Sequence, residues 1–226
     1  MANAAGQSAQ IVSDQMTAVW NNFYDGSKSL EYYADVMTAL GAATASSTDE
    51  ISQGLSKFAA VADTVGLSYE FATAALATIT SNTRESADVV GNALKTLFAR
   101  IQGLQLGETL EDGVKLGQVS SQLAKIGVNI LDVNGQMRDM GTVIEELMSK
   151  WEQLSTAEQV ATAQVVAGKR QYTQLLALME NRDMYQKNMQ IAENSAGFTN
   201  KQAEIYKESL SAVSKEVRAS LEGMWG

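Results

Sequence analysis

The sequence predicts an all-α protein, and three observations lead to that prediction. The 226 residues include no proline, so the residue that most often breaks a helix is missing. Hydrophobic residues make up 45% of the chain, which is ordinary for a folded globular protein. These residues recur at spacings of three and four behind hydroxyl-bearing residues, as in amphipathic helices with capped starts. We therefore expect a multi-helix bundle with long helices at both ends.

Helices are expected wherever such a repeat runs from a capping residue to a helix-ending glycine. Gly41, Gly66 and Gly127 are the glycines expected to end helices. The expected capping boxes are Ser47–Glu50, Thr142–Glu145, Ser155–Glu158 and Thr199–Gln202. The expected helices are residues 6–24, 29–41, 48–65, 69–81, 85–103, 117–126, 140–153, 156–167, 169–181, 183–194 and 199–223.

Two stretches interrupt the helical pattern. Residues 103–117 hold four glycines and three acidic residues, which is typical of a loop between helices. Residues 128–139 begin with alternating Val128 and Ile130 and then reach Asn134-Gly135, a dipeptide that favours tight hairpin turns. We expect a short β-hairpin-like insertion near 128–139. Because an isolated hairpin is marginal in water, it should pack on the helices around it.

The pattern divides the chain into three parts. Residues 1–25 are expected to form an N-terminal helix that continues from an upstream rod, and residues 26–194 a helical core domain. Residues 195–226 are expected to form one long helix with apolar residues at coiled-coil-like spacing. This helix either packs on its own domain or joins identical helices of other subunits. The candidate residues of that oligomer seam are Tyr206, Leu210, Val213, Val217 and Leu221.

The composition argues against several classes of function. The net charge is −9 and the 17 Lys and Arg residues are scattered, whereas nucleic-acid affinity depends on clustered cations. The chain has no Cys and no His, and so lacks the usual zinc ligands and the commonest general base. No run of about 18 apolar residues occurs. We expect no direct nucleic-acid binding, no membrane span in this segment, no cofactor and no enzyme activity.

The remaining candidates for chemistry are carboxylates. Paired acids can cleave glycans when one lies in an apolar pocket across the bond from the other, but neighbouring residues on a helix point in different directions. These pairs are better explained by capping and solvated charge: Asp49–Glu50, Glu111–Asp112 and Glu145–Glu146. Asp132, Asn134 and Asp139 offer oxygens at alternate positions, but not with EF-hand spacing. We therefore expect no catalytic and no metal-binding residues.

Five segments between Gly91 and Met179 carry a family resemblance. They are GNALKTLFARIQG, LGETLEDG, IGVNILDVNGQMRDM, LSTAEQ and VAGKRQYTQLLALM. Together they resemble the core region of phage tail tape measure proteins. The matching residues are Gly91, Leu94, Phe98, Arg100, Leu106, Gly107, Gly113, Gly127, Val128, Gly135, Arg138, Asp139, Leu154, Ser155, Gly168, Gln171 and Leu178. The stretch Thr17–Ile51 resembles the same family in phages and prophages of Gram-positive bacteria.

The resemblance implies a structural protein that takes part in tail assembly and sets tail length. Such a protein is housed in the lumen of the virion's tail tube, after assembly in the host cytoplasm, and is released when DNA is ejected. The implied partners are a few copies of the chain itself, the tail tube, tail assembly chaperones and distal tail or baseplate proteins. Because tape measure proteins are far longer, this chain is expected to be a fragment forming a folded node on a rod.

Two other functions remain open. An exported helical effector or adhesion module would carry a Trp-x-Gly turn between helices, but Trp20 is followed by Asn22 at the glycine position. A cell-wall-degrading enzyme is the third possibility.

Overall fold

The computed structural model describes residues 9–105 and 116–225, and these contain eleven helices and no strand. The prediction of an all-α fold is confirmed, and the helix ends lie close to the expected ones. The helices are α2 (Ala9–Phe23), α3 (Leu30–Ala43), α4 (Thr48–Thr64), α5 (Tyr69–Thr83), α6 (Ala87–Gln105), α7 (Leu116–Lys125), α8 (Met140–Trp151), α9 (Thr156–Ala167), α10 (Tyr172–Glu180), α11 (Arg182–Glu193) and α12 (Phe198–Trp225).

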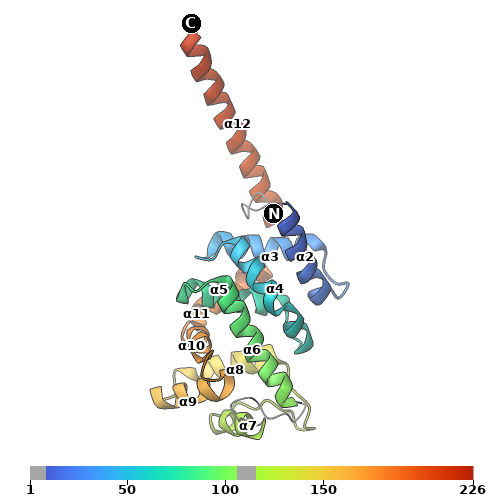
Figure 1. Ribbon diagram of the computed structural model, residues 1–226, viewed down its shortest axis with the longest axis vertical. Helices are drawn as coiled ribbons and strands as arrows, with labels where there is room; N and C mark the ends of the chain where they lie inside the picture. The colour runs from blue at the N-terminus through green and yellow to red at the C-terminus, as the bar shows by residue number, and fades with distance from the viewer. Residues whose placement is uncertain (1–8, 106–115, 226) are drawn as a thin grey trace.

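Helix α5 is the centre of the bundle. It contacts α3, α4, α6, α10 and α11, and eleven of its residues are buried. A helix that is apolar or small on every face must lie inside a protein, and the run Phe71–Ile79 meets that condition. Helices α2, α3 and α4 lie toward one end of the bundle, while α7, α8 and α9 lie at the other (Figure 1).

Helices α4 and α6 pack closely, and two glycines allow this. A Cβ atom on Gly91 would lie 2.4 Å from the carbonyl oxygen of Gly54. The two backbones therefore touch, which brings buried Leu55 and Phe58 against buried Leu94 and the rest of the core.

Gly41 does not end a helix, and that prediction is wrong. Helix α3 continues to Ala43, and a Cβ on Gly41 would lie 2.5 Å from the backbone nitrogen of Thr48. The glycine is needed for the close approach of the start of α4, not for a left-handed backbone. The predictions for Gly66 and Gly127 are confirmed, with φ of 73° and 75°.

Two of the four expected capping boxes are present. Ser47 accepts a hydrogen bond from the Glu50 N–H (3.1 Å), and Ser155 accepts one from the Glu158 N–H (3.4 Å). Each glutamate in turn accepts from the backbone N–H of its capping serine. These carboxylates sit beside free N–H groups at the positive end of a helix.

The other two boxes are wrong because a carboxylate does the capping instead. Asp139 precedes α8 and accepts from the Thr142 N–H at 2.7 Å, so Thr142 lies inside the first turn. The N–H of Thr199 donates to Asp35 in α3, and α12 begins one residue earlier, at Phe198.

The predicted β-hairpin near 128–139 is also wrong. This segment contains one isolated antiparallel bridge, between Leu131 and Met137. The two arms share backbone hydrogen bonds from Asp132 to Gln136 and from Arg138 to Ile130, too few for a strand. The Asp132 carboxylate also accepts hydrogen bonds from the N–H groups of Asn134 and Gln136, both at 2.8 Å, inside the turn. Val133 is fully exposed, and the alternating apolar pattern stops there.

Candidate functional site

The residues that carry the family resemblance build contacts between helices. Leu94 and Phe98, which follow Gly91 along α6, are buried, and Leu178 is fully buried on α10. Gln171 lies just before α10, where it lines a small cavity together with Leu94 and Leu178. These residues stabilise the packing of α6 against α10 and expose no reactive group.

Arg100 and Gly168 form one contact between α6 and the end of α9. The Arg100 guanidinium donates to the carbonyl of Val165 at 3.4 Å. Gly168 has a φ of 81°, and a Cβ there would lie 2.9 Å from the Nη1 of Arg100. Glycine is needed at this position for two reasons. It adopts the positive φ after α9, and its lack of a side chain leaves room for the guanidinium of Arg100.

Gly127, Arg138 and Asp139 fix the irregular segment 128–139 onto α8. Arg138 donates through one nitrogen to the carbonyl of Asn129 (2.6 Å) and to Glu146 (2.9 Å). This hydrogen bond lowers the pKa of the Glu146 carboxyl below its ordinary value. Lys150 lies 3.6 Å from Glu146 and also donates to the carbonyl of Gly127.

The other matching residues have local roles or fall outside the described residues. Val128 is fully buried after Gly127, and Gly135 has a φ of 76° in the turn. Leu154 packs partly buried against the core, beside the capping Ser155. Leu106, Gly107 and Gly113 lie outside the described residues, as do Glu111 and Asp112.

Helix α12 is anchored at its start by a buried carboxylate. Asp35 on α3, only 5% exposed, accepts from the N–H of Gly197 (2.6 Å) and of Thr199 (2.8 Å). Beyond this anchor α12 runs away from the bundle, as Figure 1 shows in red. Of the predicted seam, Tyr206 is 47% and Val213 is 55% exposed. The side chains of Leu210, Val217 and Leu221 fall outside the described residues.

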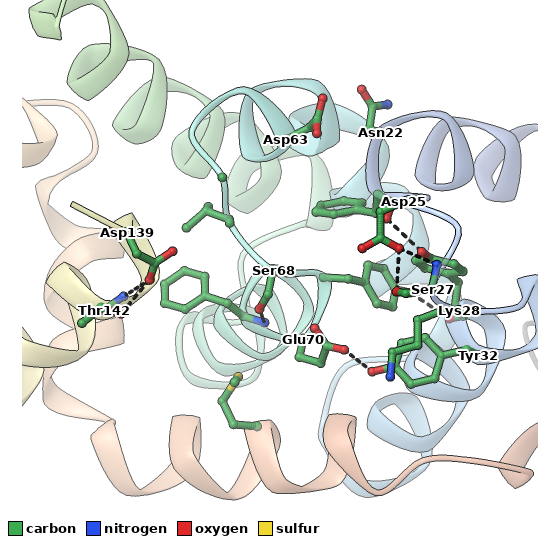
Figure 2. A pocket seen from close by; sticks show the side chains of 18 of the residues that line it. Asn22, Asp25, Ser27, Lys28, Tyr32, Asp63, Ser68, Glu70, Asp139 and Thr142 are labelled. Carbon is green, nitrogen blue, oxygen red and sulfur yellow. Dashed lines mark hydrogen bonds between the residues drawn. The ribbon is translucent and has the colours of Figure 1, made fainter. Parts of the chain in front are cut away.

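Polar and aromatic side chains line a cleft of about 470 Å³. In Figure 2 the labelled side chains reach it from the end of α2, the α2–α3 loop and the start of α3, from the end of α4, and from the starts of α5 and α8. The Tyr32 hydroxyl donates to Glu70, and the buried Tyr69 hydroxyl donates to the carbonyl of Tyr33 at 2.7 Å. Burial raises the pKa of both tyrosines.

Five of the acidic groups considered for catalysis or metal binding have structural roles. Glu50 and Asp139 cap helices, and Glu145 accepts from the Tyr185 hydroxyl at 2.8 Å. Glu146 pairs with Arg138 and Lys150, and Asp132 closes a turn. Over residues 9–105 and 116–225, no group of three or more His, Cys, Asp or Glu side chains is placed to hold a metal ion.

Comparison with known families decides which kind of protein carries this architecture. The family described as phage-related minor tail protein matches residues 1–168, which is most of the chain and includes α2 to α9. This chain belongs to the phage-related minor tail protein family. No solved structure matches it.

Membership of the phage-related minor tail protein family gives the chain a structural role in the tail of a virion. It also implies partners in tail assembly. Among the described residues of this minor tail protein, no helix is both long and apolar enough to cross a membrane.

Two features of this minor tail protein were missed by reasoning from sequence. Asp35 was not singled out, although a lone carboxylate between Tyr33 and Leu40 in an otherwise apolar stretch is a signal for a buried acid with a partner. The cleft was missed because its walls come from four separate segments of the chain. Nothing local in the sequence brings those segments together.

Proposed function

We propose that this chain is a segment of a tail tape measure protein, which takes part in tail assembly and sets tail length. Family membership over residues 1–168 carries the proposal. The segments from Gly91 to Met179 that resemble the tape measure core support the finer assignment. Those of their residues that the structure describes include contacts that stabilise the bundle.

The shape of the chain supports this role in physical terms. A ruler needs length in proportion to residue number, and a helix provides about 1.5 Å per residue. Helix α12 has 28 residues and therefore extends about 42 Å, pointing away from the bundle (Figure 1). Helices α2 to α11 fold back on one another, so they cannot serve as graduated length. In this proposal residues 26–194 form a node, residues 1–25 lead into it with α2 packed against α3 and α4, and residues 195–226 begin a rod.

The proposed partners follow from the same assignment. A few copies of the chain associate along the seam of α12, where Ile205, Tyr206 and Val213 are exposed. Burying exposed apolar residues between neighbouring helices is the usual driving force for such association. The assembly is housed in the tube lumen, is coated by tail assembly chaperones beforehand, and meets distal tail or baseplate proteins at one end. The role is structural and does not involve catalysis.

Location in the lumen can be tested because this chain has no cysteine. Ser211 is exposed on α12, and Ser211→Cys introduces a single thiol there. Intact virions carrying this variant should resist a large polyethylene-glycol maleimide and react after DNA ejection. Wild-type virions treated in parallel give the background from other proteins. Equal labelling before and after ejection would contradict a lumen location.

The other two functions gain no support from the structure. An effector module needs a turn after Trp20, but Trp20 lies inside α2 and the Asn22 side chain donates to the carbonyl of Ala18 at 2.6 Å. A cell-wall enzyme would produce clearing when this chain is run in a gel containing peptidoglycan. Such clearing would overturn the structural assignment.

A further inference from the structure

A groove runs across one side of the node and is made of two adjoining cavities. The first is the cleft of about 470 Å³, and the second is a cavity of about 460 Å³ between α8 and α11. Glu145 and Met189 line both, so the two cavities meet at these side chains. Two adjoining cavities suit an extended chain better than one compact small molecule.

Acidic side chains outnumber basic ones along the whole groove. The carboxylates that line it are Asp25, Asp63, Glu70, Asp139, Glu145 and Glu193. The cations that line it are Lys28 and Arg182. Because several carboxylates share a concave surface, their potentials add, and a cation inside the groove is attracted more strongly than one on a flat surface.

Hydrogen bonds hold several of these carboxylates in place without neutralising them. Asp25 accepts from the N–H of Ser27 (2.8 Å) and from its hydroxyl (2.6 Å), which lowers the pKa of the Asp25 carboxyl. Glu70 accepts from Tyr32 and Glu145 accepts from Tyr185. Each donor is an N–H or an O–H group, so the negative charge is not cancelled by an ion pair.

Aromatic rings and methionines form the apolar part of the lining. Tyr32 and Met189 are partly exposed in this lining, whereas Tyr69, Phe71 and Met148, which also line it, are buried. The Lys28 ammonium lies 4.7 Å from the centre of the Tyr32 ring. This cation–π contact shows that the groove already holds one lysine side chain against an aromatic face.

We propose that this groove binds a basic peptide segment of a partner protein, in which Lys or Arg alternates with apolar residues. The cations of such a segment meet the carboxylates, while its apolar side chains cover the partly exposed Tyr32 and Met189. A nucleic acid does not fit this surface because its phosphates would face the carboxylates. A purely apolar helix does not fit either, since it would bury carboxylates without a partner. The inference holds whether or not the chain is a tape measure.

The proposal can be tested by fluorescence anisotropy on the 226-residue chain. The probe is a fluorescein-labelled ten-residue peptide of alternating Lys and Leu, and its counterpart has Glu in place of Lys. The Lys peptide should bind at low salt and lose about tenfold or more in affinity at high salt. The Glu peptide should not bind. Equal binding of the two peptides would overturn the proposal.

A matched pair of triple variants separates the groove from general charge. Asp63, Glu145 and Glu193 are exposed and line the groove, so D63N/E145Q/E193Q should weaken binding of the Lys peptide about tenfold or more. The control E152Q/E180Q/D183N removes the same charge from exposed positions that do not line the groove and should change affinity less than about twofold. Thermal unfolding followed by circular dichroism checks that the two variants are equally stable. An equal loss in both variants, or none in the first, would contradict the proposal.

Competition distinguishes a peptide site from a site for any amine. Spermidine should displace the Lys peptide only at concentrations far above that of the peptide, because it has no apolar side chains that could pack on the tyrosine and methionine of the lining. Displacement at equal concentration would show that the groove recognises amines alone, which contradicts a peptide site.

Discussion

Replacing Gly91 with alanine tests the close contact between α4 and α6. The added methyl group would lie 2.4 Å from the carbonyl oxygen of Gly54 and 3.1 Å from its carbonyl carbon and Cα. Ordinary contacts begin at 3.4 Å, so the two helices must separate by about 1 Å. Backbone atoms lie on the opposing side, and no flexible side chain can move away to relieve the contact.

The free energy of unfolding should fall by about 2 kcal/mol. Overpacking a tight core costs up to about 3 kcal/mol, while alanine in place of glycine inside a helix returns about 0.5–1 kcal/mol. For a chain of this size, about 2 kcal/mol corresponds to a melting temperature lower by about 4–8 °C. Thermal unfolding followed by circular dichroism measures this shift.

Gly117→Ala is the matched control, because it is also a glycine within a helix. Gly117 is exposed in the first turn of α7, and a Cβ there meets nothing within 4 Å. This variant should unfold at the wild-type temperature or slightly above it. If Gly91→Ala is as stable as the wild type, or if the control loses as much, the reasoning about the α4–α6 contact is refuted.

Three further substitutions test other contacts. Asp35→Asn leaves one acceptor oxygen for the N–H groups of Gly197 and Thr199 and removes the charge at the start of α12. Amide hydrogen exchange should therefore speed up in the first turn of α12 but not in α5, and an unchanged exchange pattern would argue against the anchor. Asp139→Ala removes the cap of α8 and should lower the free energy of unfolding, measured with denaturant, by about 0.5–2 kcal/mol. Thr142→Val keeps that carboxylate and should lower it clearly less; the reverse order would contradict the assigned cap. Glu146→Gln should cost about 0.2–1 kcal/mol at pH 7, because Arg138 lowers the pKa of the Glu146 carboxyl in the folded state below its ordinary 4.5. A lowered folded-state pKa gives stability above pH 4.5 that is lost as pH falls through the folded value, so the wild type and this variant should converge in acid; a difference that does not depend on pH would exclude this ion pair as its source.

The helices could be predicted from the sequence because their signals are local. Ser47, Ser155 and the glycines at 66 and 127 act within one turn of themselves, so their effect can be read from neighbouring residues. The expected hairpin failed for a local reason as well. Asp132 offers its own acceptor to the turn, and the backbone pairing beside it stays at a single bridge.

The contacts that shape the node could not be predicted in this way because they join distant residues. Asp35 meets Gly197 and Thr199 from the other end of the sequence. Gly41 resembles a helix end, and only the position of Thr48 shows that it is a packing residue. The groove needs the α2–α3 loop, α5, α8 and α11 in their final places. Such contacts depend on tertiary packing, which residue spacing does not specify.

Tail length in virions is the most direct test of the claim that this minor tail protein is part of a ruler. In the phage or prophage that encodes the chain, residues 198–225 can be duplicated or triplicated in frame, which adds 28 helical residues each time. Electron microscopy should show tails longer by about 42 Å with one added copy and by about 84 Å with two. Tails of wild-type length in both strains, with the lengthened protein present in the virion, would contradict the account.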